Sequence, residues 1–336
     1  MASLIFDKVY LNESAIVGCK MEKEGPLGKY FDILYDDLYC GERTFEKAEQ
    51  HLVKDAFKQA FKKSDIKEKD IDIMFGGDLL NQITTSSYIS REYNIPFIGT
   101  FSACSSFTLT LGLAASYVNF GYANSAIAFT SSHNATAERQ FRYPLEYGVQ
   151  KKDTTTYTVS AASCTIVSNK KSDIRIKSFT IGKVNDAGIS NPNDMGNAMA
   201  ISAYDTLKTH FKDLGINHNY YDLIVTGDLS SYGKATLLEL FKRDNIDLDN
   251  YEDCGLLIYD LNNQKVFAGG SGCACCASVT LGLLKDKLKK RELKRVLVVA
   301  TGALLSTTSV GQKETIPSIA HAIGLEVVEW AICYHF

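Results

Sequence analysis

The sequence has no excess of positive charge. Its 36 Lys and Arg residues are outnumbered by 39 Asp and Glu residues, and the isoelectric point is about 6.1. Proteins that bind nucleic acid usually present a basic face, because contacts with the phosphate backbone supply much of the affinity. The charge balance therefore argues against DNA or RNA as a partner.

Proline, long apolar runs and a leader segment are also scarce or missing. Only five prolines occur among 336 residues, and we find no low-complexity tail or linker. The longest apolar stretch, residues 107–120, is broken by Thr, Gly, Ser and Asn, so it is too short and too polar to cross a bilayer. The first eight residues contain no apolar signal region. We expect any membrane association to be peripheral.

The cysteines do not form the pattern of a disulfide framework. There are nine of them, an odd number, spread along the chain, which is typical of reduced thiols in a cytosol-like compartment. Cys273, Cys275 and Cys276 lie close together, but a zinc site needs four ligands, usually as two separated pairs, and no second pair follows. We expect no metal and interpret these as small residues at a turn and helix start.

What the chain does contain is an internal repeat. With a shift of 170 residues, three segments match in order: 97–100 with 267–270, 110–113 with 280–283, and 126–129 with 296–299. Upstream, the segment 73–79 is similar to 224–229 at a shift near 150. Chance alone would rarely produce four matches in the same order. The repeat predicts two pseudo-symmetric halves, residues 1–170 and 171–336.

Hydrophobic periodicity assigns the two halves to the α/β class. Residues 45–62 and 198–214 have the apolar spacing of helices, whereas 71–75, 223–225 and 296–300 are short apolar runs typical of buried strands. Strands that alternate with helices predict right-handed βαβ units. We therefore expect sheet beside sheet, with helices between and outside them.

Cys104 is the first candidate for chemistry. It follows an apolar strand at the predicted start of a helix, where the partial positive charge of the helix lowers a thiol pKa. Its counterpart in the second half is Ala274, so only the first half carries a thiol there. The alternative is that Cys104 is a small buried apolar residue.

A second candidate is the segment 131–144, which begins where a parallel strand ends. Open α/β sheets place ligands at such ends, and this segment contains His133, Asn134, Arg139 and Arg142. Guanidinium groups suit carboxylates, and aromatic rings suit flat ligands. The alternative is a solvated loop.

Two further segments stand at predicted strand ends. Residues 76–82 include Asp78 and Asn81, but a glycine turn with a helix cap is an equally good interpretation. Residues 301–306 begin with Thr301 and should face Cys104 across the pseudo-twofold axis. Their small side chains leave room for a ligand, and they would equally suit close packing.

The pattern resembles the thiolase superfamily, which includes the ketoacyl synthases and has a duplicated five-layer α/β/α/β/α fold. The nucleophilic cysteine of that superfamily sits at a helix start in the first half, matching Cys104. Within it, the whole chain resembles the stage V sporulation AD family of spore-forming Firmicutes. The most specific stretches are residues 25–28, 77–82, 131–144, 254–259, 266–274, 300–305 and 312–321.

This resemblance implies a protein that binds dipicolinic acid (pyridine-2,6-dicarboxylic acid), with or without calcium. It implies action with the membrane proteins of the same stage V sporulation operon, at the inner spore membrane, in transport of that molecule during sporulation and in its release in germination. We also expect the protein to form a homodimer. The residues expected at the ligand are Cys104, Asp78, Asn81, His133, Asn134, Arg139, Arg142 and Thr301.

The chain departs from the enzymes of the superfamily at two places. Ketoacyl synthases of type III have a catalytic His after the strand that here is 223–225, where this sequence continues Thr226-Gly227-Asp228. They have an Asn at the turn that here is residues 269–272, Gly-Gly-Ser-Gly. Without these groups Cys104 has no evident base, so we expect a binding protein without cofactor rather than an enzyme. The alternatives are an active acyltransferase that uses Cys104 as nucleophile, and a purely structural scaffold.

Overall fold

Five strands form the main path of the sheet in the first half. They are β2 (Tyr10–Gly18), β4 (Ile73–Gly77), β5 (Phe97–Gly99), β6 (Ser125–Ser132) and β8 (Ala161–Ser168). The structure, a computed structural model, describes residues 2–329. In it these strands lie in the order β5-β4-β6-β8-β2. β4 is parallel to β5 and β6, and β8 is antiparallel to β6 and β2. β6 and β8 are buried along their whole length, which explains their small and apolar composition.

The second half repeats this strand order. Its strands are β9 (Ile174–Thr180), β11 (Leu223–Thr226), β12 (Tyr251–Asp253), β14 (Arg295–Ala303) and β15 (Pro317–Val327), arranged β12-β11-β14-β15-β9. The halves join where β2 and β9 pair antiparallel, Tyr10 with Arg175 and Leu11 with Ile174. The two halves therefore share one topology, as the repeat predicts. The exact division at residue 170 stays a prediction.

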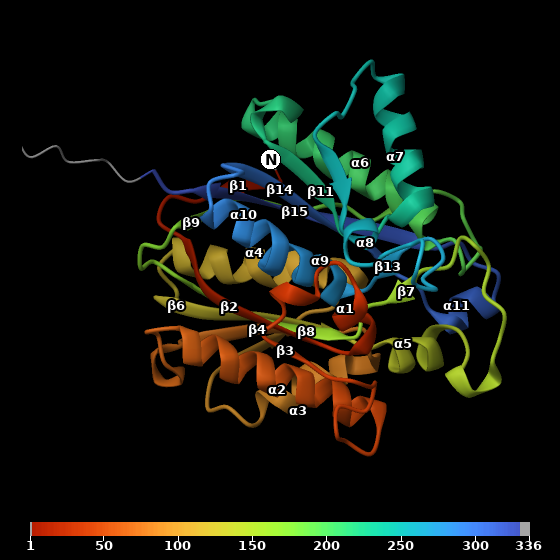
Figure 1. Cartoon of the computed structure of the whole chain (residues 1–336). Helices are drawn as coiled ribbons and strands as arrows, with labels where there is room; N and C mark the ends of the chain where they lie inside the picture. The colour runs from red at the N-terminus through yellow and green to blue at the C-terminus, as the bar shows by residue number, and fades with distance from the viewer. Residues whose placement is uncertain (1, 330–336) are drawn as a thin grey trace, which may run out of the picture.

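Helices form three layers around the sheets (Figure 1). The outer layer of the first half contains α2 (Phe45–Lys63) and α3 (Thr84–Ser90), and that of the second half contains α6 (Met195–Leu214) and α7 (Ser230–Arg243). The central layer contains α4 (Ser106–Asn119), α9 (Cys273–Val279), a π-helical turn (Thr280–Leu284) and α10 (Lys285–Lys289). The expected five-layer α/β/α/β/α arrangement is confirmed.

The central layer is close-packed because it carries small residues at its contacts with the sheets. A Cβ atom at Gly112 of α4 would lie 2.4 Å from the ring of Phe179 in β9. At the matching position of the second half, a Cβ at Gly282 would lie 2.9 Å from Tyr30. The predicted repeat of 110–113 in 280–283 thus marks the two central helices. Their glycines let the large side chains of neighbouring elements approach.

One of the four repeat matches is wrong. Residues 126–129 and 296–299 do occupy equivalent strands, since Ile73 pairs with Ala126 and Leu223 pairs with Val296. However, the counterpart of β5 is β12, because each is the parallel edge neighbour of β4 or β11. Residues 267–269 lie outside the main sheet, just before β13 (Gly270–Ser271). The second half has an additional segment between its edge strand and its central helix, which shifts the alignment.

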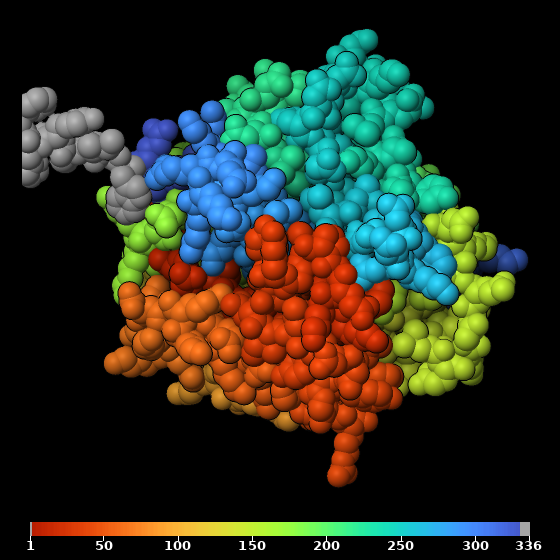
Figure 2. Space-filling model, viewed as in Figure 1, coloured from red at the N-terminus to blue at the C-terminus, as the bar shows by residue number. Residues whose placement is uncertain are grey.

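Shorter elements complete the fold. They are β1 (Ser3–Ile5), α1 (Lys20–Glu24), β3 (Ile33–Leu34), α5 (Asn134–Phe141), β7 (Tyr157–Thr158), β10 (Asn185–Asp186), α8 (Cys254–Leu257) and α11 (Thr307–Gly311). In Figure 2 the residues of the first half, red through yellow to light green, fill most of the lower part of the molecule, and those of the second half, green to blue, fill most of the upper part. Within residues 2–329, none of the helices is both long and apolar enough to span a membrane.

Candidate functional site

Cys104 lies on a tight turn that leads into the central helix α4. The turn, Ala103–Ser105, precedes Ser106 at the start of the helix. Ala103 has a φ of 45°, a left-handed conformation that is costly for a residue with a side chain. Cys104 is buried, with 9% of its surface exposed, and packs in a small apolar cluster with Leu79, Ala137 and Cys273. The sequence therefore placed this thiol correctly at a helix start.

A buried acid, Asp228, faces Cys104 from the second half. Thr301 donates a hydrogen bond from Oγ1 to Asp228 Oδ1 at 2.7 Å, and the Gly272 N–H donates to Oδ2 at 3.0 Å. Burial raises the pKa of Asp228 to about 7, although its contacts with Thr301, Cys104 and Gly272 lower it. Asp228 follows β11, at the place where the resemblance puts a catalytic His. It was absent from the predicted site.

The helix start does not lower the pKa of the Cys104 thiol. Burial raises the pKa of this thiol well above its usual range, and the negative charge of Asp228 raises it further. A contact with the Gly272 N–H opposes these effects but is the smaller influence. The helix start at Ser106 cannot compensate, because a thiolate would share a dry site with a carboxyl group. At neutral pH the side chain is a thiol.

His321 contacts the same turn, but the hydrogen bonds of its ring are to Ser102 and Gly182 and not to the thiol. Its Nδ1 accepts a hydrogen bond from the Gly182 N–H at 3.2 Å, so the neutral ring carries its proton on Nε2. Nε2 in turn lies 3.1 Å from Ser102 Oγ. Burial lowers the pKa of His321 to about 4. This histidine therefore supports the turn before Cys104 and does not act as its base in this arrangement.

The cavity above Cys104 is small. It is lined by Leu79, Ala103, Cys104, Ala137, Phe141, Arg142, Thr158, Met195, Ser271, Ala303 and Leu305, and its volume is about 30 Å³. Such a volume holds about one water molecule, whereas ligand pockets typically measure several hundred Å³. The walls come from both halves and from α5, β7 and β13, at the right-hand end of Figure 1. A ligand larger than water requires these walls to move apart.

The two arginines of the predicted site point to different places. Arg139 is exposed and forms an ion pair with Glu46 of α2, outside the cavity lining. Arg142 lines the cavity and donates from Nη2 to Glu138 Oε1 at 2.7 Å, where Lys151 Nζ also donates at 2.7 Å. Burial alone would raise the pKa of Glu138, but Arg142 and Lys151 hold it below its usual value. Two cations around one carboxylate leave one positive charge in excess.

His133 and Asn134 are buried, but neither lines the cavity. His133 donates from Nε2 to the carbonyl oxygen of Leu38 at 2.8 Å, and its ring lies 5.6 Å from that of Phe45. Burial lowers the pKa of His133 to about 4, so the ring is neutral. The Asn134 backbone N–H donates to Ser160 Oγ at 2.9 Å. His133 therefore contacts the loop at Leu38, and the Asn134 backbone helps to fix the start of α5.

Asp78 acts as a backbone cap, which was the alternative interpretation of its segment. Its Oδ1 accepts from the Leu80 N–H at 2.9 Å, and its Oδ2 accepts from the N–H and Oγ of Ser86 at 2.8 and 2.7 Å. Burial raises the pKa of Asp78 and, together with the charge of Asp78, raises that of Glu49 to about 8. Asn81 is exposed, and its backbone N–H donates to Gln140. Neither predicted residue lines the cavity.

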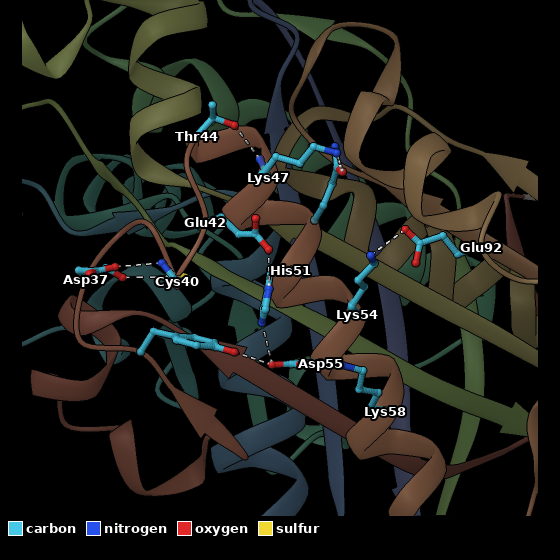
Figure 3. Close-up of polar contacts among 12 residues, drawn as sticks. Asp37, Cys40, Glu42, Thr44, Lys47, His51, Lys54, Asp55, Lys58 and Glu92 are labelled. Atoms are coloured by element: carbon cyan, nitrogen blue, oxygen red, sulfur yellow. Dashed lines mark hydrogen bonds and ion pairs between the residues drawn. The ribbon is translucent and has the colours of Figure 1, made fainter.

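A separate polar cluster covers the outer side of α2 (Figure 3). His51 Nδ1 lies 2.9 Å from Glu42 Oε1, and its Nε2 lies 3.5 Å from Asp55 Oδ2. Tyr35 donates to Asp55 Oδ2 at 2.6 Å, and Lys58 Nζ lies 3.1 Å from Oδ1. These contacts tie the loop before α2 to the helix. Because none of the five lines the cavity, we assign them to structure rather than to the site.

No metal centre accompanies the site in the part of the chain that is described. Among residues 2–329, no group of three or more His, Cys, Asp or Glu side chains could hold a metal ion. The cysteines at 273, 275 and 276 are buried at the start of α9, as small residues at a helix start were expected to be.

Comparison with known proteins assigns the family. The model of the family described as stage V sporulation protein AD matches residues 2–326. The stage V sporulation protein AD of Bacillus subtilis (strain 168) is 49% identical over 319 residues, which covers 95% of this chain and 94% of that protein.

Solved structures support the fold at much lower identity. A single-residue variant of OleA from Xanthomonas campestris has a TM-score of 0.61 at 15% identity, covering 96% of this chain and 99% of its own. The 3-oxoacyl-[acyl-carrier-protein] synthase III of Aquifex aeolicus VF5 has a TM-score of 0.57 at 13% identity, covering 95% and 99%. These likenesses concern the fold alone. The chain belongs to the stage V sporulation protein AD family, built on a thiolase-like fold.

Proposed function

We propose that this protein binds dipicolinic acid without chemically transforming it, and that it takes part in moving this molecule across the inner spore membrane during sporulation and in its release in germination. Its membership of a sporulation family supports the biological setting. The observation that carries the choice of binding over catalysis is the pairing of Cys104 with the buried acid Asp228.

This pairing disfavours covalent chemistry at Cys104. A nucleophilic cysteine needs a thiolate, usually stabilised by a cation, a base or a helix start. Here the helix start is opposed by burial and by Asp228, and the pKa of the thiol is raised well above its usual range. The neighbouring His321 is neutral and bonded to Ser102. A thiol of this kind serves best as a small group on the floor of a binding cavity.

The cationic rim of the cavity suits a carboxylate ligand. Arg142 and Lys151 both contact Glu138, so one positive charge is not neutralised within this cluster. Charge-assisted hydrogen bonds from a guanidinium to a carboxylate are among the strongest in proteins. Phe141 and Leu79 supply apolar surface for a flat ring. Because the cavity holds about 30 Å³, binding requires Phe141 and Arg142 to move outward.

The remaining predicted residues would act indirectly. Thr301 holds the carboxyl of Asp228 at 2.7 Å and so shapes the floor. Asp78 and Asn134 fix the turns on which the walls stand. Arg139, His133 and Asn81 have contacts outside the lining, and we no longer expect them to touch the ligand.

The proposed partners are the membrane proteins of the same sporulation operon and a second copy of this chain, with the protein peripheral to the inner spore membrane. The edge of the sheet offers a surface for the second copy. β5 is an edge strand, and Ile98 within it and Phe101 just after it are exposed by 36% and 51%. Unpaired strand edges flanked by apolar side chains favour pairing with another chain. Calcium would enter as the chelate formed by the ligand's own carboxylates.

Calorimetric titration tests the proposal. Dipicolinate should bind with a saturable heat, whereas benzoate, with one carboxylate, and isophthalate, which lacks the ring nitrogen, should bind more weakly. Equal binding of all three compounds would indicate a general carboxylate site that is not specific for dipicolinate. Absence of any heat, confirmed by unchanged thermal unfolding at saturating ligand, would contradict the proposal.

The second candidate function is acyl transfer through Cys104. The strained turn favours it, because a left-handed residue before a nucleophile is a way of exposing it, and Ala103 has a φ of 45°. Incubation with acyl-CoA donors followed by intact-mass measurement distinguishes the two. A mass shift that maps to Cys104 and disappears on incubation with an acceptor would establish the enzyme.

A further inference from the structure

A second pocket lies at the opposite end of the molecule from Cys104. It measures about 510 Å³ and borders the place where β2 meets β9, at the left-hand end of Figure 1. It is lined by Tyr10, Arg175, Tyr220, Lys294, Arg295, Glu326, Val327, Val328 and Glu329. This volume is within the range of small-molecule sites, unlike that of the cavity at Cys104.

Part of the pocket wall comes from the most basic segment of the chain. Residues 285–295 contain seven Lys and Arg residues and only two acidic ones, while the chain as a whole has a net charge of -3. Two of these residues, Lys294 and Arg295, line the pocket. The nearby Asp222 carboxylate accepts both of their backbone N–H groups, at 2.6 and 2.8 Å. Both of these hydrogen bonds are accepted by Asp222 Oδ2, so this oxygen is already bonded to the main chain.

One of the two acids in the pocket lining, Glu326, is already neutralised, whereas the other, Glu329, forms no ion pair within residues 2–329. Glu326 is nearly buried and receives a hydrogen bond from Arg175 Nη2 at 2.8 Å and another from the Tyr220 hydroxyl at 2.6 Å. The other two cations have no such partner. Among residues 2–329, no ion pair is formed by Lys294 or Arg295. The pocket lining therefore combines one satisfied carboxylate–guanidinium pair with the unpaired acid Glu329 and two unpaired cations, so one positive charge stays in excess.

The Arg295 guanidinium is also held in a fixed orientation. It lies over the ring of Tyr220, 4.4 Å from the ring centroid, and Tyr220 is itself anchored by its hydroxyl to Glu326. A guanidinium that stacks on an aromatic ring keeps its N–H groups in the plane of the fork, free to meet two oxygens of one acid. Little side-chain entropy is left to lose on binding such a group.

We propose that this pocket is an oxyanion-binding site. Arg295 is the main donor, Lys294 is a second cation at the rim, and Tyr220 supports the guanidinium. The ligand class is a carboxylate or phosphate group, carried either by a small soluble molecule or by a lipid headgroup at a membrane surface. The proposal does not rest on the function assigned to the Cys104 cavity, because the two lie at opposite ends of the fold.

The first arm of the test uses free anions. The arginine Nε–Hε resonances of the whole protein are followed by NMR during titration with inorganic phosphate and, separately, with benzoate. We expect one resonance, assigned to Arg295 by its loss in Arg295→Gln, to shift and saturate. Arg295→Gln should weaken binding about tenfold or more, the value of one charge-assisted hydrogen bond. Lys313→Gln, which alters an exposed lysine after α11, is the matched control and should bind as wild type.

The second arm identifies the source of the anion. Co-sedimentation with vesicles of phosphatidylglycerol, compared with phosphatidylcholine, should depend on Arg295 if the anion is a headgroup, and should be independent of it if the anion is a soluble molecule. Because Lys294 is exposed, Lys294→Gln should fold normally. It gives a second measurement of anion binding, in which we expect a smaller loss of affinity than in Arg295→Gln. The proposal is overturned if neither phosphate, benzoate nor anionic vesicles bind, or if Arg295→Gln and Lys294→Gln bind as wild type.

Discussion

Replacing Asp228 by Asn tests the electrostatics of the site through the pH dependence of stability. The pKa of Asp228 is about 7 in the folded protein, compared with 3.8 for an unperturbed Asp, because the carboxyl is buried. Between pH 4 and 7 the native state therefore holds a proton that the unfolded state has lost. Wild-type stability falls as the pH rises through this window, whereas Asn is neutral throughout.

The size of the effect follows from the shift. About three pKa units correspond to a change on the order of 4 kcal/mol in the difference between variant and wild type. Asn keeps an acceptor for Thr301 but turns an amide N–H₂ toward the Gly272 N–H, which costs about 1–2 kcal/mol. We expect Asp228→Asn to be about as stable as wild type near pH 5, because by then wild type has lost about as much as the substitution costs, and about 2–3 kcal/mol more stable than wild type at pH 8.

Urea unfolding at five pH values from 5 to 9, at constant salt, measures this difference, and groups shared by both proteins cancel. Asp213→Asn is the control. Asp213 is partly exposed and its pKa is lowered by the Ala2 N–H, so its difference from wild type should be flat over this range. If the stability difference between Asp228→Asn and wild type is independent of pH, or changes in the opposite direction, Asp228 is not a buried acid with a raised pKa.

Three further changes separate ligand contacts from structural contacts. Arg142→Gln should weaken dipicolinate binding about tenfold or more, while Arg139→Gln, outside the cavity lining, should leave the affinity unchanged by calorimetry; equal losses in both would place the ligand elsewhere. Asp78→Ala leaves three donors without their acceptor and should lower the free energy of unfolding by about 2 kcal/mol or more in urea, with unchanged affinity per folded molecule; a selective loss of affinity would make Asp78 a ligand residue. Tyr35→Phe removes one hydrogen bond to Asp55 and should cost about 1 kcal/mol with no effect on binding, and a larger loss of affinity than of stability would contradict a structural role.

The layers of the fold could be predicted from the sequence because their signals are long. The 19 residues of α2 and the nine of β14 carry enough periodicity to be assigned, and the glycines at 112 and 282 mark equivalent helices. The edge strands could not be matched in this way. β5 and β12 have three residues each, so an unrelated Phe-Ala-Gly-Gly at 267–270 resembled β5 better than its true counterpart did.

The site was harder to predict because its contacts are non-local. Cys104 was found from its helix start, but Asp228 lies 124 positions further along the chain, and only the fold brings its carboxyl to the thiol. Burial then reverses the effect expected of the helix. Arg139 and Arg142 are three residues apart and would share a helix face. However, α5 ends at Phe141, and Arg142 adopts a non-helical backbone conformation that turns it toward the cavity.

The most direct test of the central claim is a calorimetric comparison of dipicolinate binding to wild type, Cys104→Ala and Cys104→Leu. Ala nearly preserves the volume of the cavity floor and leaves the start of α4 unchanged, so a binding protein should retain most of its affinity. Leu adds bulk to a cavity of about 30 Å³ and should abolish binding while the protein stays folded, as judged by circular dichroism. Dipicolinate that binds Cys104→Leu as tightly as wild type would contradict the account, because the ligand would then occupy a different site.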